Sequence, residues 1–260
     1  MVSLRLLFSG AALAVGLAGA ANATVLYSTG FEPPAFTQTA INGQNGWAVY
    51  THSGTEASAP FVQNIIVASG TQAVLAPGTV SAQTGPYYAL TIASPGVIDL
   101  SADIFNFTPA GGAADAIQFA ATGPLLTQYA GGIDITGTSI FAISGGFPVI
   151  GSFSDSTFHH VDLLLDYTTQ TFDVKLDGAT LASGLAFCGS NGACNGANVA
   201  TFGDGLFDNF GGTNGYGVID NFSIATVTGV PEPATWALLI AGVGLAGGAL
   251  RRRAGKKVAA

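Results

Sequence analysis

Residues 158–178 read FHHVDLLLDYTTQTFDVKLDG, and their pattern is the most informative about the fold. Apolar side chains occupy every second position on both of its arms: Val161, Leu163, Leu165 and Tyr167 on the first, and Phe172, Val174 and Leu176 on the second. A polar turn, Thr168-Thr169-Gln170, separates the arms, and Asp177-Gly178 offers a second tight turn. Because side chains alternate between the two faces of a strand, the pattern predicts a hairpin with one buried face.

Short β-rich runs recur in the rest of the chain, separated by clusters of Gly, Pro, Asn and Ser. They cover residues 61–68, 87–93, 96–107, 116–121, 132–136 and 139–144. Short strands at regular spacing are typical of a sandwich or a barrel. No exact internal repeat is present, which argues against a propeller or a solenoid. No segment predicts a helix between the two ends of the chain.

The hairpin also resembles a known group of folds. Its His-His-Val-x-Leu-x-x-Asp pattern at 159–166, followed by an arm that ends in Asp-Gly, resembles the hairpin of concanavalin A-like sandwiches, including laminin-G-type modules. Gly30-Phe31-Glu32, Asn42–Trp47 and Val218–Ile224 fit the same group of exported proteins. The resemblance implies an all-β, two-sheet jelly roll whose first and last strands pair. It implies no activity, because this fold hosts lectins, glycosidases and inert spacers.

The first 23 residues predict a secretory signal peptide. Arg5 supplies a positive start, residues 6–20 are apolar, and Ala21-Asn22-Ala23 forms an A-x-A cleavage box. We therefore expect the Sec translocon and signal peptidase to act on the chain, and the mature protein to begin near Thr24. The alternative is a retained membrane helix, for which the apolar run is short.

The other end carries a proline-flanked acid, an apolar segment and a basic cluster. Val230-Pro231-Glu232-Pro233 precedes residues 234–250, which carry no charge, and Arg251-Arg252-Arg253 opens the basic tail 251–260. At about 1.5 Å per residue, the apolar segment spans roughly 25 Å as a helix, slightly less than a hydrocarbon core of about 30 Å. Since positive charges stay on the cytoplasmic side, we expect a membrane helix with residues 24–229 outside.

These three elements resemble the PEP-CTERM sorting signal of Gram-negative bacteria. The resemblance implies processing by an exosortase, a membrane cysteine protease-transpeptidase, after export across the inner membrane. It also implies delivery to the cell surface or the extracellular matrix, in the company of exopolysaccharide and biofilm genes. The alternative is an ordinary tail anchor, which has no need of two prolines around an acid.

Charge limits the partners of the central domain, residues 24–229. It contains fourteen of the fifteen acidic residues, while Lys175 is its one basic side chain apart from histidine, a formal charge of −13. Phosphate binding needs lysine or arginine, so the sequence excludes nucleic acid as a partner. Divalent cations suit such a surface, but acidity also serves simply to keep an exported protein soluble.

Two cysteines, Cys188 and Cys194, bracket a short loop rich in Gly and Asn. An exported chain meets an oxidising compartment, so we expect a disulfide that closes this surface loop. The alternative is a metal pair, for which no His or third Cys lies nearby in the sequence.

No catalytic motif is present in the central domain. The Glu-x-Asp-x-x-Glu strand motif of glucanases and the G-x-S-x-G elbow of serine hydrolases are both absent. The acids of the hairpin, Asp162, Asp166, Asp173 and Asp177, could supply a glycosidase with two carboxylates, but their alternation already explains them as solvent-facing residues. His159 and His160 are neighbours on one strand and point to opposite faces, so they cannot chelate one metal together. We expect no enzyme.

The sequence offers two candidate binding sites. The segment Asp204–Tyr216 combines aromatic, Asp, Asn and Gly residues, as sugar sites do, although the same residues are also ordinary in loops. Glu32 and Asp220 sit on the expected first and last strands and could share a structural calcium ion through their oxygens. Asp220 could equally be an exposed strand residue. No other cofactor is expected.

The sequence therefore predicts an exported, exosortase-sorted, single-domain β-sandwich. Its expected function is that of a non-enzymatic surface or matrix protein associated with polysaccharide. The alternatives are a glycan-active enzyme on the same fold and a structural matrix protein without a ligand.

Overall fold

The computed structural model describes residues 22–53, 59–78, 83–109, 116–126, 128–190, 194, 198–210 and 215–228. Residues 23–228 form one compact unit. Most of the expected signal peptide and the whole sorting tail lie outside the described residues, whereas Asn22 and Ala23 already belong to the first strand. Within these described ranges, no helix is long and apolar enough to cross a membrane.

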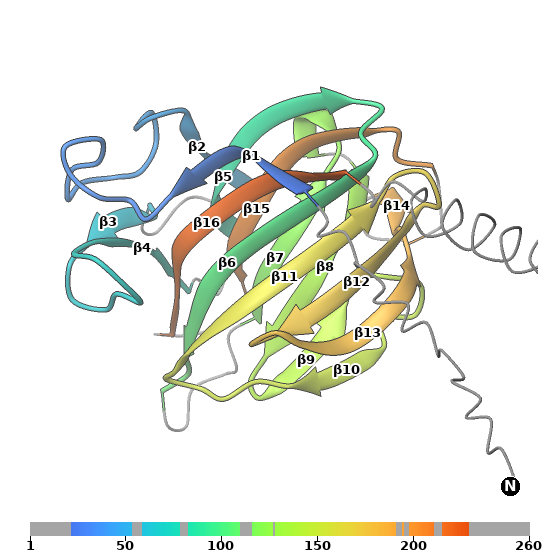
Figure 1. Ribbon diagram of the computed structural model, residues 1–260. Helices are drawn as coiled ribbons and strands as arrows, with labels where there is room; N and C mark the ends of the chain where they lie inside the picture. Colours follow the sequence, from blue (N-terminus) through green and yellow to red (C-terminus); the bar gives the residue numbers. More distant parts are fainter. Residues whose placement is uncertain are drawn as a thin grey trace, which may run out of the picture. The chain divides into compact units, whose positions relative to one another are not determined.

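The domain consists of two antiparallel sheets that face each other (Figure 1). The first sheet has the order β13 (Ala179–Ala186), β12 (Thr171–Leu176), β11 (Phe158–Asp166), β6 (Val97–Phe107), β16 (Tyr216–Thr228), β4 (Ala73–Pro77) and β3 (Phe61–Gln63), with β1 (Asn22–Thr29) paired to β16. The second sheet has the order β10 (Val149–Ser152), β9 (Ser139–Ala142), β8 (Gln128–Thr136), β7 (Ala116–Thr122), β15 (Thr201–Phe210), β5 (Gln83–Ala93) and β2 (Trp47–Ser53), with β14 (Gly189–Ser190) paired to β8. A short 3-10 turn, η1 (Pro124–Leu126), joins β7 to β8.

The chain passes repeatedly from one sheet to the other, as a jelly roll requires. The first and last strands of the domain, β1 and β16, pair side by side. The fold class that the sequence predicts, a two-sheet jelly-roll sandwich, is therefore confirmed.

The hairpin predicted from residues 158–178 forms as strands β11 and β12. Val161, Leu163 and Leu165 pair with Leu176, Val174 and Phe172 across the two strands. Their side chains point into the core, and none of the three on β11 exposes any surface. The turn to β13 is made by Asp177 and Gly178, both in the left-handed region at φ 50° and 78°. A two-residue turn of this kind matches the twist of the strands that it joins.

Two segments differ from the sequence expectation. The run 61–68 is a strand only as far as Gln63, because the Gln63 side chain bonds the backbone beyond it: Oε1 accepts from the N–H groups of Ile65 (2.6 Å) and Ile66 (2.9 Å), and Nε2 donates to Ile66 O (2.6 Å). These bonds close a turn in place of the sheet ladder. The segment Asp204–Tyr216, in which loop residues abound, begins as strand, since residues 204–210 belong to β15.

An aromatic cluster joins the two sheets at the end where β1 and β16 pair. Phe222 of β16 has its ring centroid 5.0 Å from that of Trp47 in β2 and 6.5 Å from that of Phe119 in β7. On β15, Gly205 makes room for it, because a Cβ there would lie 2.6 Å from Phe222 Cζ. The Trp47 indole N–H donates to Tyr27 Oη on β1 at 2.9 Å, so the buried tryptophan is satisfied.

We expect Phe222→Ala to lower the free energy of unfolding by about 3–5 kcal/mol, because a large side chain with no exposed surface would leave a cavity between the sheets. Chemical denaturation measures this value. Val227→Ala, on the outer side of the same strand, serves as the control and should cost about 1 kcal/mol or less. Equal losses in the two variants would contradict the role assigned to Phe222.

Candidate functional site

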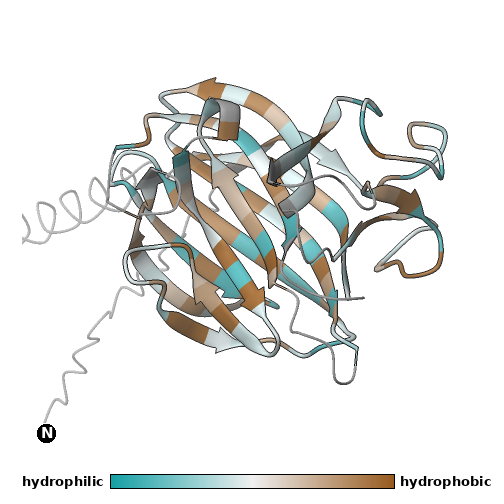
Figure 2. Cartoon of the chain, turned by 180° about the vertical axis from the view of Figure 1, so that it is seen from behind, coloured by the Kyte–Doolittle hydropathy of each residue, from teal (hydrophilic) through white to brown (hydrophobic). Residues whose placement is uncertain are grey.

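The outer face of the second sheet carries acidic residues at its centre. On β15, Gly205 and Phe207 face the core, so Asp204, Leu206 and Asp208 face outward. Figure 2 shows the resulting alternation of hydrophilic and hydrophobic bands along the strands. Asp204 is 4% exposed and Asp208 is 0% exposed. An outward-facing residue can be buried only where other segments of the chain cover it, so part of this face is covered.

The strand register arranges these residues in rows. Asp204 lies opposite Thr122 of β7, whose hydroxyl donates to Asp204 Oδ2 at 3.3 Å. Asp208 lies opposite Gln118 of β7, and Gln118 lies opposite Asp134 of β8. Two strands, β15 and β8, therefore bring three carboxylates to one face, with β7 between them, in two rows four residues apart along β15.

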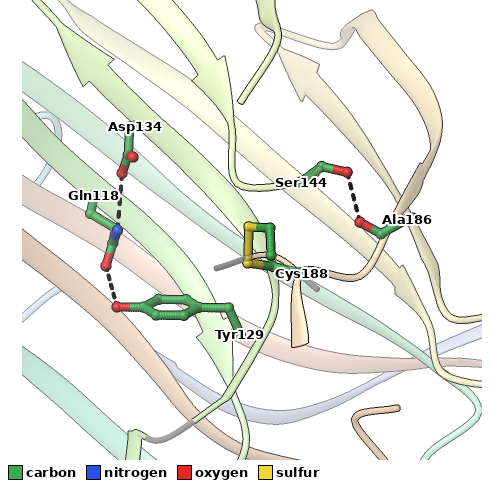
Figure 3. The surroundings of a disulfide bond; sticks show 7 residues. Gln118, Tyr129, Asp134, Ser144, Ala186 and Cys188 are labelled. Carbon is green, nitrogen blue, oxygen red and sulfur yellow. Dashed lines mark hydrogen bonds between the residues drawn. A yellow bond between two sulfur atoms is a disulfide. The ribbon is translucent and has the colours of Figure 1, made fainter. Parts of the chain in front are cut away.

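The second row contains a chain of hydrogen bonds. Tyr129 Oη donates to Gln118 Oε1 at 2.8 Å, and Gln118 Nε2 donates to Asp134 Oδ1 at 3.0 Å (Figure 3). Burial raises the pKa of Asp134 to about 6, although the Gln118 hydrogen bond opposes the shift. The pKa of Tyr129 is also raised, mainly by burial and further by the charge of Asp208. The side chains of this row are thus fixed in place and electrostatically coupled.

A disulfide covers the middle of the same face. The structure pairs Cys188 with Cys194, and Cys188 is 1% exposed. Cys188 belongs to a small apolar cluster on the sheet, whose other buried members are Ala120, Tyr129, Ile143 and Leu206. Figure 3 shows the disulfide beside Tyr129 and the Gln118–Asp134 pair. The loop that the sequence places at the surface is therefore anchored on the sheet through one of its cysteines.

Beside the disulfide, β5, β2 and η1 enclose a cavity of about 380 Å³. It is lined by Tyr50, Tyr87, Ala89, Thr91, Pro124, Leu126 and Asp204. Ala89, Thr91 and Pro124 are exposed, so the cavity opens to solvent, while Asp204 forms part of its buried wall. Burial raises the pKa of Asp204 to about 6 against the lowering effect of its hydrogen bonds. We call this space the outer-face cavity.

The two residues expected to hold calcium both reach one loop, but only Asp220 lies on its expected strand, since β1 ends at Thr29, before Glu32. Glu32 Oε1 accepts from the backbone N–H groups of Thr71 (2.7 Å) and Gln72 (3.1 Å), and its Oε2 accepts from the Thr71 hydroxyl. Asp220 is buried, and its Oδ2 accepts from the N–H groups of Ala68 (3.0 Å) and Ser69 (3.1 Å). Asp220 is thus no exposed strand residue.

These hydrogen bonds do not fit a cation held between Glu32 and Asp220, because the oxygens named above already accept from N–H and O–H donors. Among the described residues, no three His, Cys, Asp or Glu side chains are grouped so as to hold a metal ion. Calcium at this corner stays a prediction.

The histidines of β11 lie in separate polar contacts. His159 Nδ1 lies 2.6 Å from Asp177 Oδ2, and the His159 ring packs on Phe153. His160 Nδ1 lies 2.6 Å from Asp103 Oδ1, and the hydrogen bond to Asp103 raises the pKa of His160. Each histidine thus has its own carboxylate partner, and neither lies on the second sheet.

Of the residues that line the cavity, the sequence marks Asp204 as part of a candidate site. Asp204 lies in the segment interpreted as a sugar site, whereas Tyr50, Tyr87 and Asp134 went unnoticed. No motif marks these three residues. The period-two pattern of strand 87–93 predicts a face for Tyr87, but it does not predict which strands lie beside it.

Comparison with known proteins identifies the tail. Residues 229–253 match the PEP-CTERM protein-sorting motif. The chain therefore carries the sorting signal of an exported protein whose tail is handled at the membrane. No curated protein matches the sequence.

Several solved structures are similar to this chain at low sequence identity. A sialidase matches with 12% identity and a TM-score of 0.49 over 73% of this chain, which spans 18% of the sialidase. A peanut lectin matches with 10% identity and a TM-score of 0.48, over 82% of this chain and 100% of the lectin. The cellulose-induced protein Cip1 matches with 13% identity and a TM-score of 0.47, over 76% of this chain and 96% of its own.

Proposed function

We propose that this protein is a non-enzymatic surface or extracellular-matrix protein that binds polysaccharide in the outer-face cavity. The observation that carries the proposal is the lining of that cavity, in which two tyrosines stand beside the buried carboxyl of Asp204. Sugar rings pack their C–H faces on aromatic rings, and a carboxylate accepts hydrogen bonds from their hydroxyls.

The dimensions of the cavity support this proposal. Its volume of about 380 Å³ lies within the usual range of small-ligand sites, about 300–1,000 Å³. Its exposed residues, Ala89, Thr91 and Pro124, leave an open side through which a polymer could continue. An open site of this kind suits one stretch of a long glycan.

One observation favours a glycan-active enzyme as the second candidate. Asp134 and Asp208 flank Gln118 on neighbouring strands, and two strand spacings put their backbones about 10 Å apart. Glycoside hydrolysis needs two carboxyls at about 5–10 Å, one of them with a raised pKa, as Asp134 has. We prefer a binding function to an enzymatic one because Gln118 lies between the two carboxyls. Its side-chain amide already donates to Asp134 and accepts from Tyr129.

The sorting motif supports a route for the chain. We propose export through the Sec translocon, removal of the leader by signal peptidase, transient anchoring by residues 234–250, and processing by an exosortase near Pro231–Pro233. A processed domain would then reach the cell surface or a polysaccharide matrix such as a biofilm.

We expect Tyr87→Ala to weaken binding of the protein to its preferred polysaccharide at least about tenfold, because a ring that lines the cavity would be lost. A polysaccharide array identifies the ligand, and calorimetry measures the affinity. Tyr216→Ala, on the first sheet, is the matched control and should leave binding unchanged. Release of reducing ends from the polysaccharide would instead support the enzyme. If neither binding nor release of reducing ends is detected, a structural protein without a ligand is supported.

The intact mass of the protein from the envelope and medium of its native host tests the proposed route. We expect a chain that begins near Thr24 and ends near Pro231–Pro233. A mass that retains residues 234–260 would contradict exosortase processing and leave a plain tail anchor.

Chelation tests calcium at the Glu32–Asp220 corner. A calcium tie predicts that EDTA lowers the Tm of the purified protein and that added Ca²⁺ restores it. An unchanged Tm would mean that the hydrogen bonds of Glu32 and Asp220 hold the loop without a metal. In either case Asp220→Ala should lower the free energy of unfolding by about 1–3 kcal/mol, because the hydrogen bonds from the N–H groups of Ala68 and Ser69 to this buried carboxylate would be lost.

A further inference from the structure

The two outer faces of the sandwich differ in charge. The central domain contains no arginine, and its single lysine, Lys175, belongs to β12 of the first sheet. There it lies opposite Asp162 of β11, and its charge opposes the rise that burial causes in the pKa of Asp99. No lysine or arginine occurs in the sequence of any strand of the second sheet. A ligand in the outer-face cavity therefore meets acids without any fixed positive charge.

The acids of the second sheet act on the tyrosines around the cavity. The charge of Asp208 raises the pKa of Tyr50, which lines the cavity, in addition to the effect of burial. Asp208 and Asp134 both raise the pKa of Tyr129. Asp204 lies in the cavity wall itself. The charges that reach the cavity lining are thus negative, from Asp204 and Asp208 of β15.

We propose that the outer-face cavity selects a polysaccharide that carries free amino groups, an amino-sugar polymer with ammonium groups, over neutral and acidic polysaccharides. This inference rests on the proposed function and names the class of its ligand. An ammonium group close to a buried carboxylate gains a charge-assisted hydrogen bond, and tyrosine rings attract cations as well.

Acidic polysaccharides would be rejected by the same chemistry. A uronate or sulfate group is recognised by arginine or lysine, and the second sheet has neither. A like charge next to the buried carboxylate of Asp204 would be repelled. Neutral sugars would meet no repulsion, but they would leave Asp204 without a counter-charge. The ranking is therefore amino-sugar polymer first, neutral polymer second and acidic polymer last.

The test uses three oligosaccharides of equal length: a fully deacetylated glucosamine oligomer, its N-acetylated counterpart and an oligouronate. The full chain, purified in detergent, is titrated with each by calorimetry at neutral pH. We expect the glucosamine oligomer to bind at least about tenfold more tightly than the acetylated one. We expect no measurable binding of the oligouronate.

Two variants separate a specific contact from general attraction to an acidic protein. Asp204→Asn should abolish most of the preference for the glucosamine oligomer. Asp173→Asn removes the same charge from the first sheet, and an asparagine oxygen there can still accept from Gly184 N–H, as Asp173 does at 2.8 Å. It should leave the preference intact. If Asp204→Asn does not fold, Asp208→Asn takes its place and should reduce the preference in part, because Asp208 acts on Tyr50 of the cavity lining.

The outcomes distinguish this inference from the proposed function. Equal affinity for the glucosamine and acetylated oligomers, or an equal loss in Asp204→Asn and Asp173→Asn, would overturn the preference for amino groups. If either the acetylated oligomer or the oligouronate binds best and Tyr87→Ala weakens that binding, glycan binding stands and the ligand class is wrong. If no oligosaccharide or arrayed polysaccharide binds, both proposals fall.

Discussion

The packing of Phe222 between the two sheets is the constraint on which the rest of the domain depends. Phe222 comes from the last strand of the first sheet and meets Trp47 and Phe119 of the second. A residue without a side chain is needed opposite it, and Gly205 of β15 fills that position. Once Gly205 faces inward, strict alternation turns its neighbours Asp204 and Leu206 outward. The position of the acids on the outer face thus follows from the packing of the core.

Burying carboxyls in an outward-facing row costs desolvation free energy, and the fold does not require it. Desolvation raises the pKa values of Asp134 and Asp204 to about 6, so each carries its charge at neutral pH against the preference of its surroundings. An uncharged polar residue would fill the same space at a smaller desolvation cost. Raised carboxyl pKa values of this kind cluster at functional sites, and on the second sheet they occur in and beside a cavity that could hold a ligand.

The sequence carries enough information for the fold and only a fraction of the site. The hairpin at 158–178 follows from period two alone, and the stretches around Phe31, Trp47 and Phe222 mark residues that meet in one aromatic cluster. The cavity is different, because Asp204, Tyr87 and Tyr50 come from β15, β5 and β2. Alternation predicts the face of each residue, but the order β15-β5-β2 is a property of the assembled sheet. The end of β3 was missed for a local reason, namely the side-chain turn of Gln63.

The acids around His160 on the first sheet have basic partners that Asp134 and Asp204 of the second sheet lack among the described residues, and this difference bears on function. On the first sheet, Asp103 is bonded to His160 and to the Asn221 amide at 2.6 Å, while Asp162 lies 3.3 Å from His160 and opposite Lys175. That network balances its charge with side chains of the chain itself. On the second sheet, Asp134 and Asp204 receive neutral donors, from Gln118 and Thr122. Neutral donors stabilise a carboxylate without neutralising it, so the negative charge of this face remains for a partner from outside the chain.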